Sequence, residues 1–300
     1  MADTSKGIVE YATAGTGPAL LVIHGAYGGY DQGLLFGRDF ADAGFGAIAP
    51  SRPGYLHTPL ATGRTFPEAA DAFAALLDTL GVARALVMTI SGGGLTGLEL
   101  CRRHPGRVAA LVLACSIARR YVPNPDNTAA AWIDKLFYTS PGVWLMHFGA
   151  RLAPRAAAEA MLRTMSDYGR DTRKAVAARI AADRRKRRFL LKLLQGFSPF
   201  SLRRDGLRNE LDEAARYDEN PDWSGIKTPT LIVHGKRDAD VPFDTHAAYA
   251  ARTIPHAETC FSETGFHLLP LCDDYPEMHN AMTAFLQRHA GSASRLPAEA

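Results

Sequence analysis

The chain has 300 residues, a length that suits one elaborated domain or two smaller ones. Hydrophobic residues make up 47% and charged residues 22% of it, which is typical of soluble globular proteins and excludes disordered and fibrous classes. No apolar run approaches the ~18 residues of a membrane span, and the first residues lack a signal-peptide pattern. We therefore expect a cytoplasmic protein without a membrane partner. Its four cysteines lack metal-binding spacing and are expected to be reduced thiols.

The formal charge of +3 is unevenly distributed along the chain. Residues 121–218 contain 18 Lys or Arg against 11 Asp or Glu, whereas the remainder contains 16 against 20. A basic middle third between acidic flanks indicates a unit of different character.

The first 116 residues alternate short apolar runs with helical patterns. Expected buried strands are Ala19 to His24, Gly46 to Ser51, Arg84 to Ile90 and Val108 to Ser116, with an antiparallel pair near Ile8 to Ala14. Expected helices are Asp31 to Ala43, Phe66 to Leu80 and Gly92 to Arg103. This alternation predicts a parallel sheet with helices on both sides.

Residues 121–220 contain no convincing strand, and the expected helices there are Ala129 to Phe137, Ala156 to Met165 and Asp171 to Leu194. Alternation resumes with strands at Thr230 to His234 and Glu258 to Ser262 and helices at Pro242 to Thr253 and Asp273 to His289. We therefore expect a core made of residues 1–120 and 221–290, divided by an all-helical insertion at 121–220. Residues 291–300 are expected to form a flexible tail.

A serine stands between an expected strand and helix, in the segment Thr89 to Gly94. A serine on such a tight turn exposes its hydroxyl at the carboxyl edge of the sheet, so Ser91 is a candidate nucleophile. Alternatively, Ser91 only caps the helix that follows.

An acid and a histidine follow two later strands. Asp238 lies in the loop after Thr230 to His234, and His267 lies in the loop after the last strand. The chain order nucleophile, acid, histidine is that of one class of serine hydrolases, and the carboxyl ends of parallel strands converge at one edge. Asp240 is a rival acid, but we expect it to cap the next helix.

The glycine-rich segment His24 to Gly29 follows another strand. The backbone N–H groups of Ala26 and Gly92 could together bind the oxyanion of a tetrahedral intermediate. A phosphate-binding loop is the alternative, but neither GxGxxG nor GxxxxGK[ST] is present.

These pieces, with Ser51 to Tyr55, Gly235 to Pro242 and Gly265 to His267, resemble the α/β-hydrolase fold superfamily, in its serine branch with a helical cap. The resemblance covers residues 1–120 and 225–290 and implies a mostly parallel eight-stranded sheet with the insertion as cap. It implies Ser91 as nucleophile, His267 as base, Asp238 as orienting acid, and Ala26 and Gly92 as oxyanion donors. No metal or organic cofactor is implied. Thr89 departs from the family's usual glycine.

The resemblance implies hydrolysis of a carboxylic ester through an acyl-enzyme, with a small-molecule substrate and a monomer or homodimer as the assembly. Two alternatives remain: a C–C bond hydrolase of ring-cleavage diketones, and a non-catalytic binding protein of the same fold. Ser91 on the tight turn argues against dehalogenases and epoxide hydrolases, because those family members carry Asp at this position.

The expected cap contains a basic run, Arg184 to Arg188. With a total charge of only +3 we interpret it as a solvated helix and expect no nucleic-acid partner. The cap's charge favours an anionic substrate, and Arg203 and Arg204 are candidates to bind it. Trp132 and Trp144 are candidates to line an apolar pocket for an aromatic or acyl group.

Overall fold

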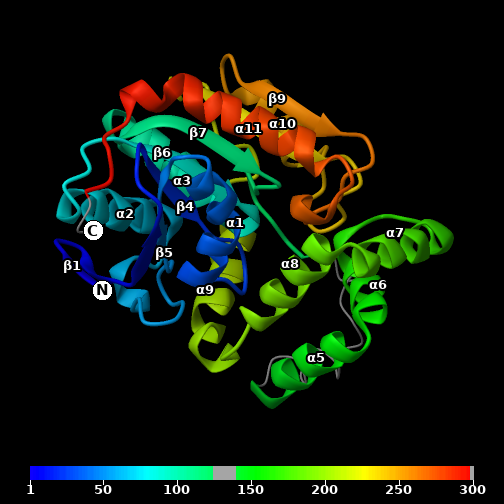
Figure 1. Ribbon diagram of the computed structural model, residues 1–300. Helices are drawn as coiled ribbons and strands as arrows, with labels where there is room; N and C mark the ends of the chain where they lie inside the picture. The colour runs from blue at the N-terminus through cyan, green and yellow to red at the C-terminus, as the bar shows by residue number, and fades with distance from the viewer. Residues whose placement is uncertain (124–139, 298–300) are drawn as a thin grey trace.

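The computed structural model describes residues 1–123 and 140–297. Its centre is a sheet in the order β3-β5-β4-β6-β7-β8-β9 (Figure 1). Only β3 runs antiparallel to its neighbour, and the other pairs are parallel. The expected α/β class with a mostly parallel sheet is confirmed, although seven strands rather than eight belong to this sheet among the described residues.

The strands follow the apolar runs of the sequence. The fully buried ones are β4 (Ala19–Ile23), β5 (Gly46–Pro50), β6 (Ala85–Ile90), β7 (Val108–Ala114) and β8 (Thr230–Gly235). Continuous apolar runs are what a parallel sheet covered on both faces requires. The more exposed edges are β3 (Tyr11–Ala14) and β9 (Glu258–Ser262).

The antiparallel pair expected near Ile8 to Ala14 is wrong in its partners. A separate hairpin joins β1 (Ala2–Thr4) to β2 (Gly7–Val9), and β3 pairs with β5 in the main sheet. Local alternation in the sequence marked the strands, but their pairing depends on residues that lie some 35 positions later in the chain.

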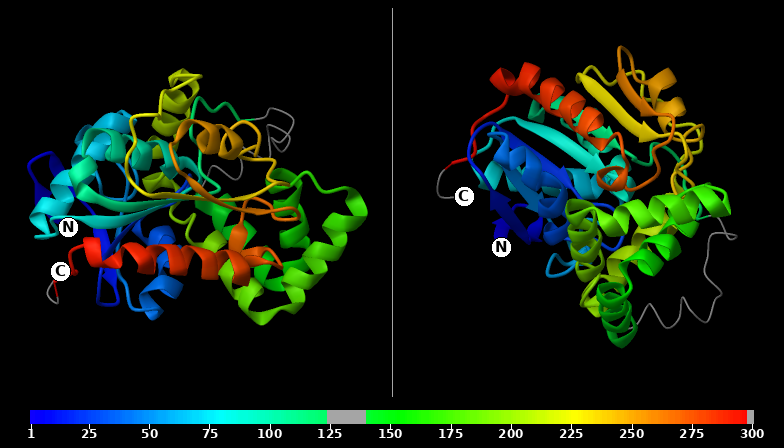
Figure 2. Two further views of the ribbon diagram at one scale, coloured as in Figure 1. Left: turned by 90° about the horizontal axis from the view of Figure 1, so that it is seen from above. Right: turned by 45° about the vertical axis from the view of Figure 1, so that its right-hand side comes forward.

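Helices cover both faces of the sheet (Figure 2). One face packs against α2 (Phe66–Thr79), α3 (Gly94–Arg103) and α10 (Ala247–Thr253), and the other against α1 (Tyr30–Asp42) and α11 (Tyr275–His289). The alternation along β4 divides its side chains between the two cores: Leu21 and Ile23 on one side, Leu20 and Val22 on the other. The edge of the sheet at the carboxyl ends of the parallel strands is thereby left for the loops.

The insertion between β7 and β8 is helical in its described part. It contains α5 (Ser140–Leu152), α6 (Pro154–Met165), α7 (Arg170–Ala182), α8 (Arg184–Gln195) and α9 (Arg204–Arg216). Figure 1 shows α5 to α8 projecting to one side of the core, while α9 returns beneath it. The helix expected at Ala129 to Phe137 lies outside the described residues. No described helix has the length and apolar character to cross a bilayer.

The single helix expected from Asp171 to Leu194 is in fact two. The break is at Asp183, whose backbone is extended (ψ 121°) and whose side chain accepts a hydrogen bond from Lys186 N. An Asp that caps the next helix stabilises such a break. The basic run therefore begins α8 instead of continuing α7.

The flexible tail expected after residue 290 is wrong for residues 291–297. Ser294 N donates to Arg84 O (2.8 Å), and Ser294 O accepts from Ala19 N (2.8 Å). Leu296 N donates to Gly17 O (2.9 Å), and the Leu296 side chain is buried. Small polar residues look mobile in a sequence, but here they pair with the start of the core.

Candidate active site

Ser91 lies on the sharp turn between β6 and α3. Its φ of +51° is in the left-handed region, a strained conformation for a residue with a side chain and typical of a nucleophile elbow. Neighbouring glycines allow the close approach: a Cβ placed on Gly25 would lie 2.8 Å from Ser91 Cβ, and one on Gly93 would lie 2.7 Å from Ile23 O. The turn exists because these residues have no side chains.

Thr89, the residue that departs from the family pattern, is accommodated by a glycine on the next helix. A Cβ on Gly97 of α3 would collide with Thr89 Cγ2, so Gly97 provides the space that Thr89 occupies. The Thr89 hydroxyl is 2.8 Å from Ser116 Oγ, so its polar atom is also satisfied. The elbow forms with threonine at this position.

The structure brings the three sequence candidates together. His267 Nε2 is 3.0 Å from Ser91 Oγ, and His267 Nδ1 is 2.8 Å from Asp238 Oδ2. Asp238 Oδ1 accepts from the backbone N–H groups of Asp240 (3.0 Å) and Val241 (2.8 Å), which fix the carboxylate. A serine, an imidazole and an oriented carboxylate in one hydrogen-bonded line can generate a nucleophile.

The charges in this line shift its titration strongly. Burial disfavours the charged form of Asp238, but His267 and His234 hold its pKa well below the usual range. Burial lowers the pKa of His267, yet the carboxylates of Asp238 and Asp240 outweigh it and raise this pKa to about 9. The site therefore favours an imidazolium at neutral pH, the species that forms when His267 takes a proton from serine.

Asp240, the rival acid, occupies a different side of the imidazole. Its Oδ2 is 3.3 Å from His267 Nε2, and its Oδ1 accepts from Tyr121 OH (3.1 Å). Burial is the main cause that raises the pKa of Asp240, and the negative charge of Asp238 raises it further. Geometry thus separates the two acids, because Asp238 contacts Nδ1 and Asp240 lies beside the nitrogen that faces Ser91. The expected helix-capping role of Asp240 is wrong, since α10 begins only at Ala247.

The loop carrying Ala26 is held against Gly92. Ala26 N lies 3.5 Å from the position that a Cβ on Gly92 would take. Gln32 anchors the loop at both ends: its Oε1 accepts from Gly25 N (2.8 Å), and its Nε2 donates to Ala26 O (3.2 Å). The backbone of Gly92 therefore lies beside Ala26 N, and these are the two positions whose N–H groups are expected to bind an oxyanion.

His24 has a structural role in this loop. Burial, and then the charge of Arg52, lower its pKa well below the usual value, so the ring is neutral. Its Nε2 accepts from Arg52 N (2.9 Å), which leaves Nδ1 to donate to Gly25 O (2.7 Å). The ring ties the loop after β4 to the segment after β5.

A third acid at the site, Glu210 of α9, was not expected from the sequence. Its Oε2 accepts from Arg52 Nη2 (2.7 Å) and from Tyr55 OH, and all three side chains are buried. Its Oε1 lies where a Cβ on Gly92 would have to be. Arg52 and Tyr55 belong to a segment that the family resemblance did single out, whereas a lone Glu on a surface-like helix carries no motif. This ion pair joins the cap's last helix to the serine turn.

The two arginines expected to bind an anionic substrate are otherwise engaged. Arg203 is fully buried, and it donates to Asp31 Oδ2 (2.7 Å) and to Gly28 O (2.5 Å). Its charge is neutralised, and its contacts support the loop that carries Ala26. Arg204 is exposed and lies 3.4 Å from its neighbour Asp205. The geometry supports a substrate contact for neither of them.

The expected tryptophan pocket is also not supported. Trp144 is 61% exposed and stacks on Phe148, with ring centroids 5.5 Å apart, and Trp132 lies outside the described residues. An apolar cluster beside Ala26 is instead formed by Tyr27, Tyr55, Val143, Met146, Phe197, Phe200, Leu207 and Leu211. This cluster packs against Ala26 and takes most of its members from α5, α9 and the segment between α8 and α9.

One group of three potential metal ligands occurs among the described residues: Cys115, His234 and Asp238. Asp238 Oδ2 already bonds to His267 and lies 3.3 Å from His234 Nε2. Burial, and secondarily the charge of Asp238, raise the pKa of the Cys115 thiol well above its usual value, which disfavours the thiolate a metal would need. These residues suit the orientation of Asp238 better than metal binding.

Comparison with known proteins agrees with this architecture. The family described as alpha/beta hydrolase fold matches residues 18–272. A solved alpha/beta hydrolase fold protein from Nakamurella multipartita is 33% identical, covers 97% of this chain and 98% of its own, and superposes with a TM-score of 0.88.

Two curated relatives have named activities. A pimeloyl-[acyl-carrier protein] methyl ester esterase of Aromatoleum aromaticum is 28% identical over 80% of this chain and 87% of its own. A 2-hydroxy-6-oxo-6-phenylhexa-2,4-dienoate hydrolase of Comamonas testosteroni is 24% identical over 81% and 79%. With the serine turn, the mostly parallel sheet and the helical insertion in place, the chain belongs to the α/β-hydrolase fold family.

Proposed function

We propose that this protein hydrolyses carboxylic esters through an acyl-enzyme on Ser91. The observation that carries the proposal is the continuous line from Ser91 Oγ through His267 to Asp238, with contacts of 3.0 and 2.8 Å. A nucleophile, a base within hydrogen-bond reach and an orienting acid are the parts that acyl transfer requires.

In this mechanism His267 Nε2 takes the proton of Ser91 Oγ as that oxygen attacks the ester carbonyl. The N–H groups of Ala26 and Gly92 stabilise the oxyanion that forms. His267 then returns the proton to the departing alkoxide, which leaves as an alcohol. Water, deprotonated by His267, attacks the acyl-enzyme, and collapse of the second intermediate releases the acid and restores the serine. Asp238 stabilises the imidazolium in both halves.

We infer that the ester is uncharged near its scissile bond. Asp240 and Glu210 lie beside His267 and Gly92, and the nearby guanidinium of Arg52 is paired with Glu210. An anion would meet three carboxylates, those of Asp238, Asp240 and Glu210, against two cations, Arg52 and the His267 imidazolium, contrary to the preference that the sequence suggested. The apolar cluster beside Ala26 suits an uncharged acyl chain. The relative from Aromatoleum aromaticum likewise acts on a methyl ester, by its name.

C–C bond hydrolysis of a diketone is a second candidate. Such a reaction must deliver a proton to a carbon leaving group, and the raised pKa of His267, about 9, favours a stored proton there. The relative from Comamonas testosteroni is named for this kind of substrate. The non-catalytic alternative has no comparable support, because all three members of the hydrogen-bonded line are present.

A fluorophosphonate probe tests the nucleophile. We expect labelling of the full-length protein that is abolished by Ser91→Ala and retained by Ser224→Ala, an exposed serine far along the chain. Labelling that survives Ser91→Ala, or no labelling at all, would refute a serine mechanism.

A substrate panel then separates the two reactions. It would pair p-nitrophenyl esters of increasing chain length with phthalate monoesters, their neutral diesters and vinylogous diketones. Higher kcat/KM for neutral esters supports the proposal, and turnover of the diketones alone would favour C–C hydrolysis. Labelling without turnover of any substrate would leave the binding-protein alternative.

A further inference from the structure

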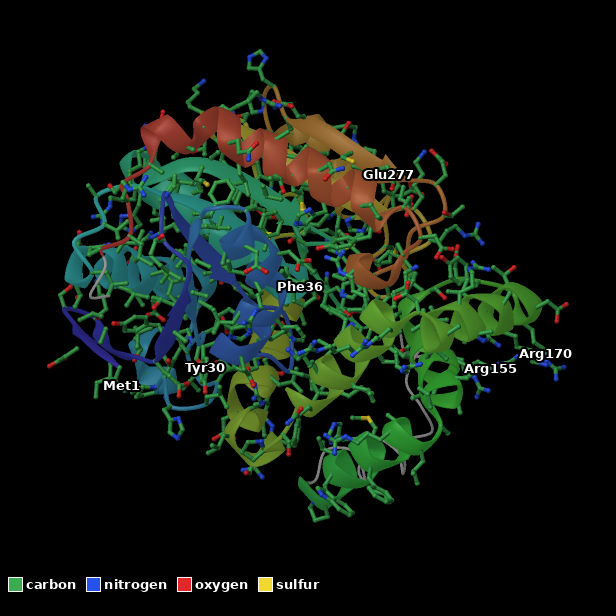
Figure 3. All side chains as sticks on the ribbon, viewed as in Figure 1. Met1, Tyr30, Phe36, Arg155, Arg170 and Glu277 are labelled. Atoms are coloured by element: carbon green, nitrogen blue, oxygen red, sulfur yellow. The ribbon has the colours of Figure 1, made fainter. Side chains whose placement is uncertain are left out.

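The basic run at the start of α8 divides into two sets with different surroundings. Arg185 pairs with Asp39 (2.7 Å) and Lys186 pairs with Asp273 (2.5 Å), and both acids belong to the hydrolase core. Phe189 on the same side of α8 contacts Phe36 of α1, labelled in Figure 3, with ring centroids 5.3 Å apart. This side of α8 attaches the cap to the core.

The other side of α8 faces α5 across a solvent-open groove of about 360 Å³, which is called the cavity below. The cavity is lined by His147, Arg151, Arg184, Arg187, Arg188, Leu191, Lys192 and Gln195. The six α8 residues among them recur at intervals of three and four, so they form one stripe along the helix. Five of the eight lining residues are Arg or Lys, and none is acidic.

These five cations lack acidic partners within residues 1–123 and 140–297. None forms an ion pair there, although Arg103, Arg179 and Arg288 elsewhere in the chain all do. Arg187 Nη1 is held by Ala181 O (2.8 Å), a neutral carbonyl that positions the guanidinium without cancelling its charge. Like charges gathered around one cavity repel each other, and a bound anion would relieve that repulsion.

His147 lines the cavity from α5 and has one ring nitrogen that is unpaired in the described part of the chain. Its Nε2 is buried at the cavity and has no hydrogen-bond partner among the described residues. Burial, followed by the charge of Arg151, lowers the pKa of His147. This nitrogen has almost no accessible surface, so the ring does not offer it to a group in the cavity, and the proposal rests on the five cations.

We propose that the cavity between α5 and α8 binds a small oligoanion that carries at least two phosphate groups. Its volume lies in the range of small-molecule sites. One guanidinium group can donate two parallel hydrogen bonds to the oxygens of a phosphate. One carboxylate would leave most of the five positive charges unbalanced, whereas two or three linked phosphates match them. The site is separate from Ser91, and its occupancy does not depend on the proposed hydrolysis.

Calorimetric titration of the full-length protein with inorganic triphosphate, at about 0.15 M salt, tests the site. We expect Arg188→Gln and Arg184→Gln each to weaken binding roughly tenfold, the scale of one lost charge-assisted contact. Arg185→Gln is the matched control, because it removes the same charge from the same helix but faces Asp39. It should change the affinity less than twofold. Unchanged thermal unfolding without ligand would show that each variant is folded.

Four results would overturn the proposal. They are no binding of triphosphate, equal losses in Arg188→Gln and Arg185→Gln, binding of orthophosphate or citrate as tight as triphosphate, and tighter binding of a single-stranded oligonucleotide. Equal losses would mean attraction to net charge without a site. Ser91→Ala should bind triphosphate like the unaltered protein, so failure here and failure of the proposed hydrolysis are distinguishable.

Discussion

The charged side chains around Ser91 are paired with opposite charges, whereas those around the cavity between α5 and α8 are not. At the serine, Arg52 is paired with Glu210, Arg203 with Asp31, and His267 with Asp238, all buried or largely buried. In the cavity, five cations have no acidic partner among the described residues. A buried charge must be paired because its desolvation is costly, whereas partly solvated cations can await a ligand. The charge of a segment therefore does not reveal which of its residues remain free to bind.

The largest expected effect comes from Gly92→Ala, which tests the close packing around the serine. A methyl group there collides with Glu210 Oε1 and forces either the carboxylate or the oxyanion N–H to move. We expect kcat for an ester to fall about 10²–10³-fold, the range for a lost oxyanion donor. The double variant Gly92→Ala/Glu210→Ala should recover part of this loss. An undiminished kcat in Gly92→Ala would contradict the assigned packing.

Arg203→Met tests whether Arg203 supports the fold or binds substrate. Removing a buried partner usually costs 3–5 kcal/mol, and because Asp31 is about one-third exposed we expect about 2–4 kcal/mol in the free energy of unfolding. Urea unfolding measures this change. Arg204→Met, at an exposed site, should change stability by less than about 0.5 kcal/mol. A selective loss of activity on anionic esters in Arg203→Met, with stability unchanged, would restore the substrate-binding role.

Asp240→Asn tests the second carboxylate through pH dependence. His267 must be neutral to act as base, so kcat/KM should rise with pH through the His267 pKa of about 9. Burial opposes this raised value, and the charges of Asp238 and Asp240 cause it. Removing one charge should move the rising limb to lower pH and increase kcat/KM at pH 7 several-fold. The control is Asp244→Asn, which removes an exposed acid four residues later in the chain. If the pH profile of kcat/KM rises at the same pH in both variants, Asp240 does not raise the pKa of His267.

The same linkage predicts a dependence of stability on pH. The His267 pKa in the folded state lies above its ordinary value of 6.5, so the folded state binds a proton more tightly. The resulting stabilisation is complete below about pH 6.5 and is lost as pH rises through about 9. Chemical denaturation across this range should show the decline, and Asp240→Asn should reduce it.

The smallest effect is expected for Trp144→Ala, which tests the apolar pocket that the sequence led us to expect at Trp144. The side chain is 61% exposed, so we expect less than about 0.5 kcal/mol in stability and less than a twofold change in kcat/KM. Val143→Ala, one residue away and buried in the apolar cluster, should have the larger effect on KM for long-chain esters. A larger effect of Trp144→Ala than of Val143→Ala on KM would support the aromatic pocket expected at Trp144.

The sequence by itself determined the sheet strands and the meeting of Ser91, Asp238 and His267. Apolar runs set the strands, and residues just beyond the carboxyl ends of parallel strands must converge at one edge. It also determined that the insertion is helical in the part that the structure describes, because no run between β7 and β8 has strand character. The single helix expected from Asp171 to Leu194 and the flexibility expected for residues 291–297 were wrong. The helix break at Asp183 and the pairing of Ser294 with Arg84 depend on contacts that a local sequence pattern does not record.

Only the tertiary structure decided which charges are used and which are free. Glu210 reaches Arg52 from 158 positions away, and Arg203 reaches Asp31 from 172. Within the basic run, residues one position apart face either the core or the cavity, because successive helical positions are rotated by about 100°. Electrostatic roles depend on which partner lies within a few ångströms, and that distance is set by the packing of whole elements.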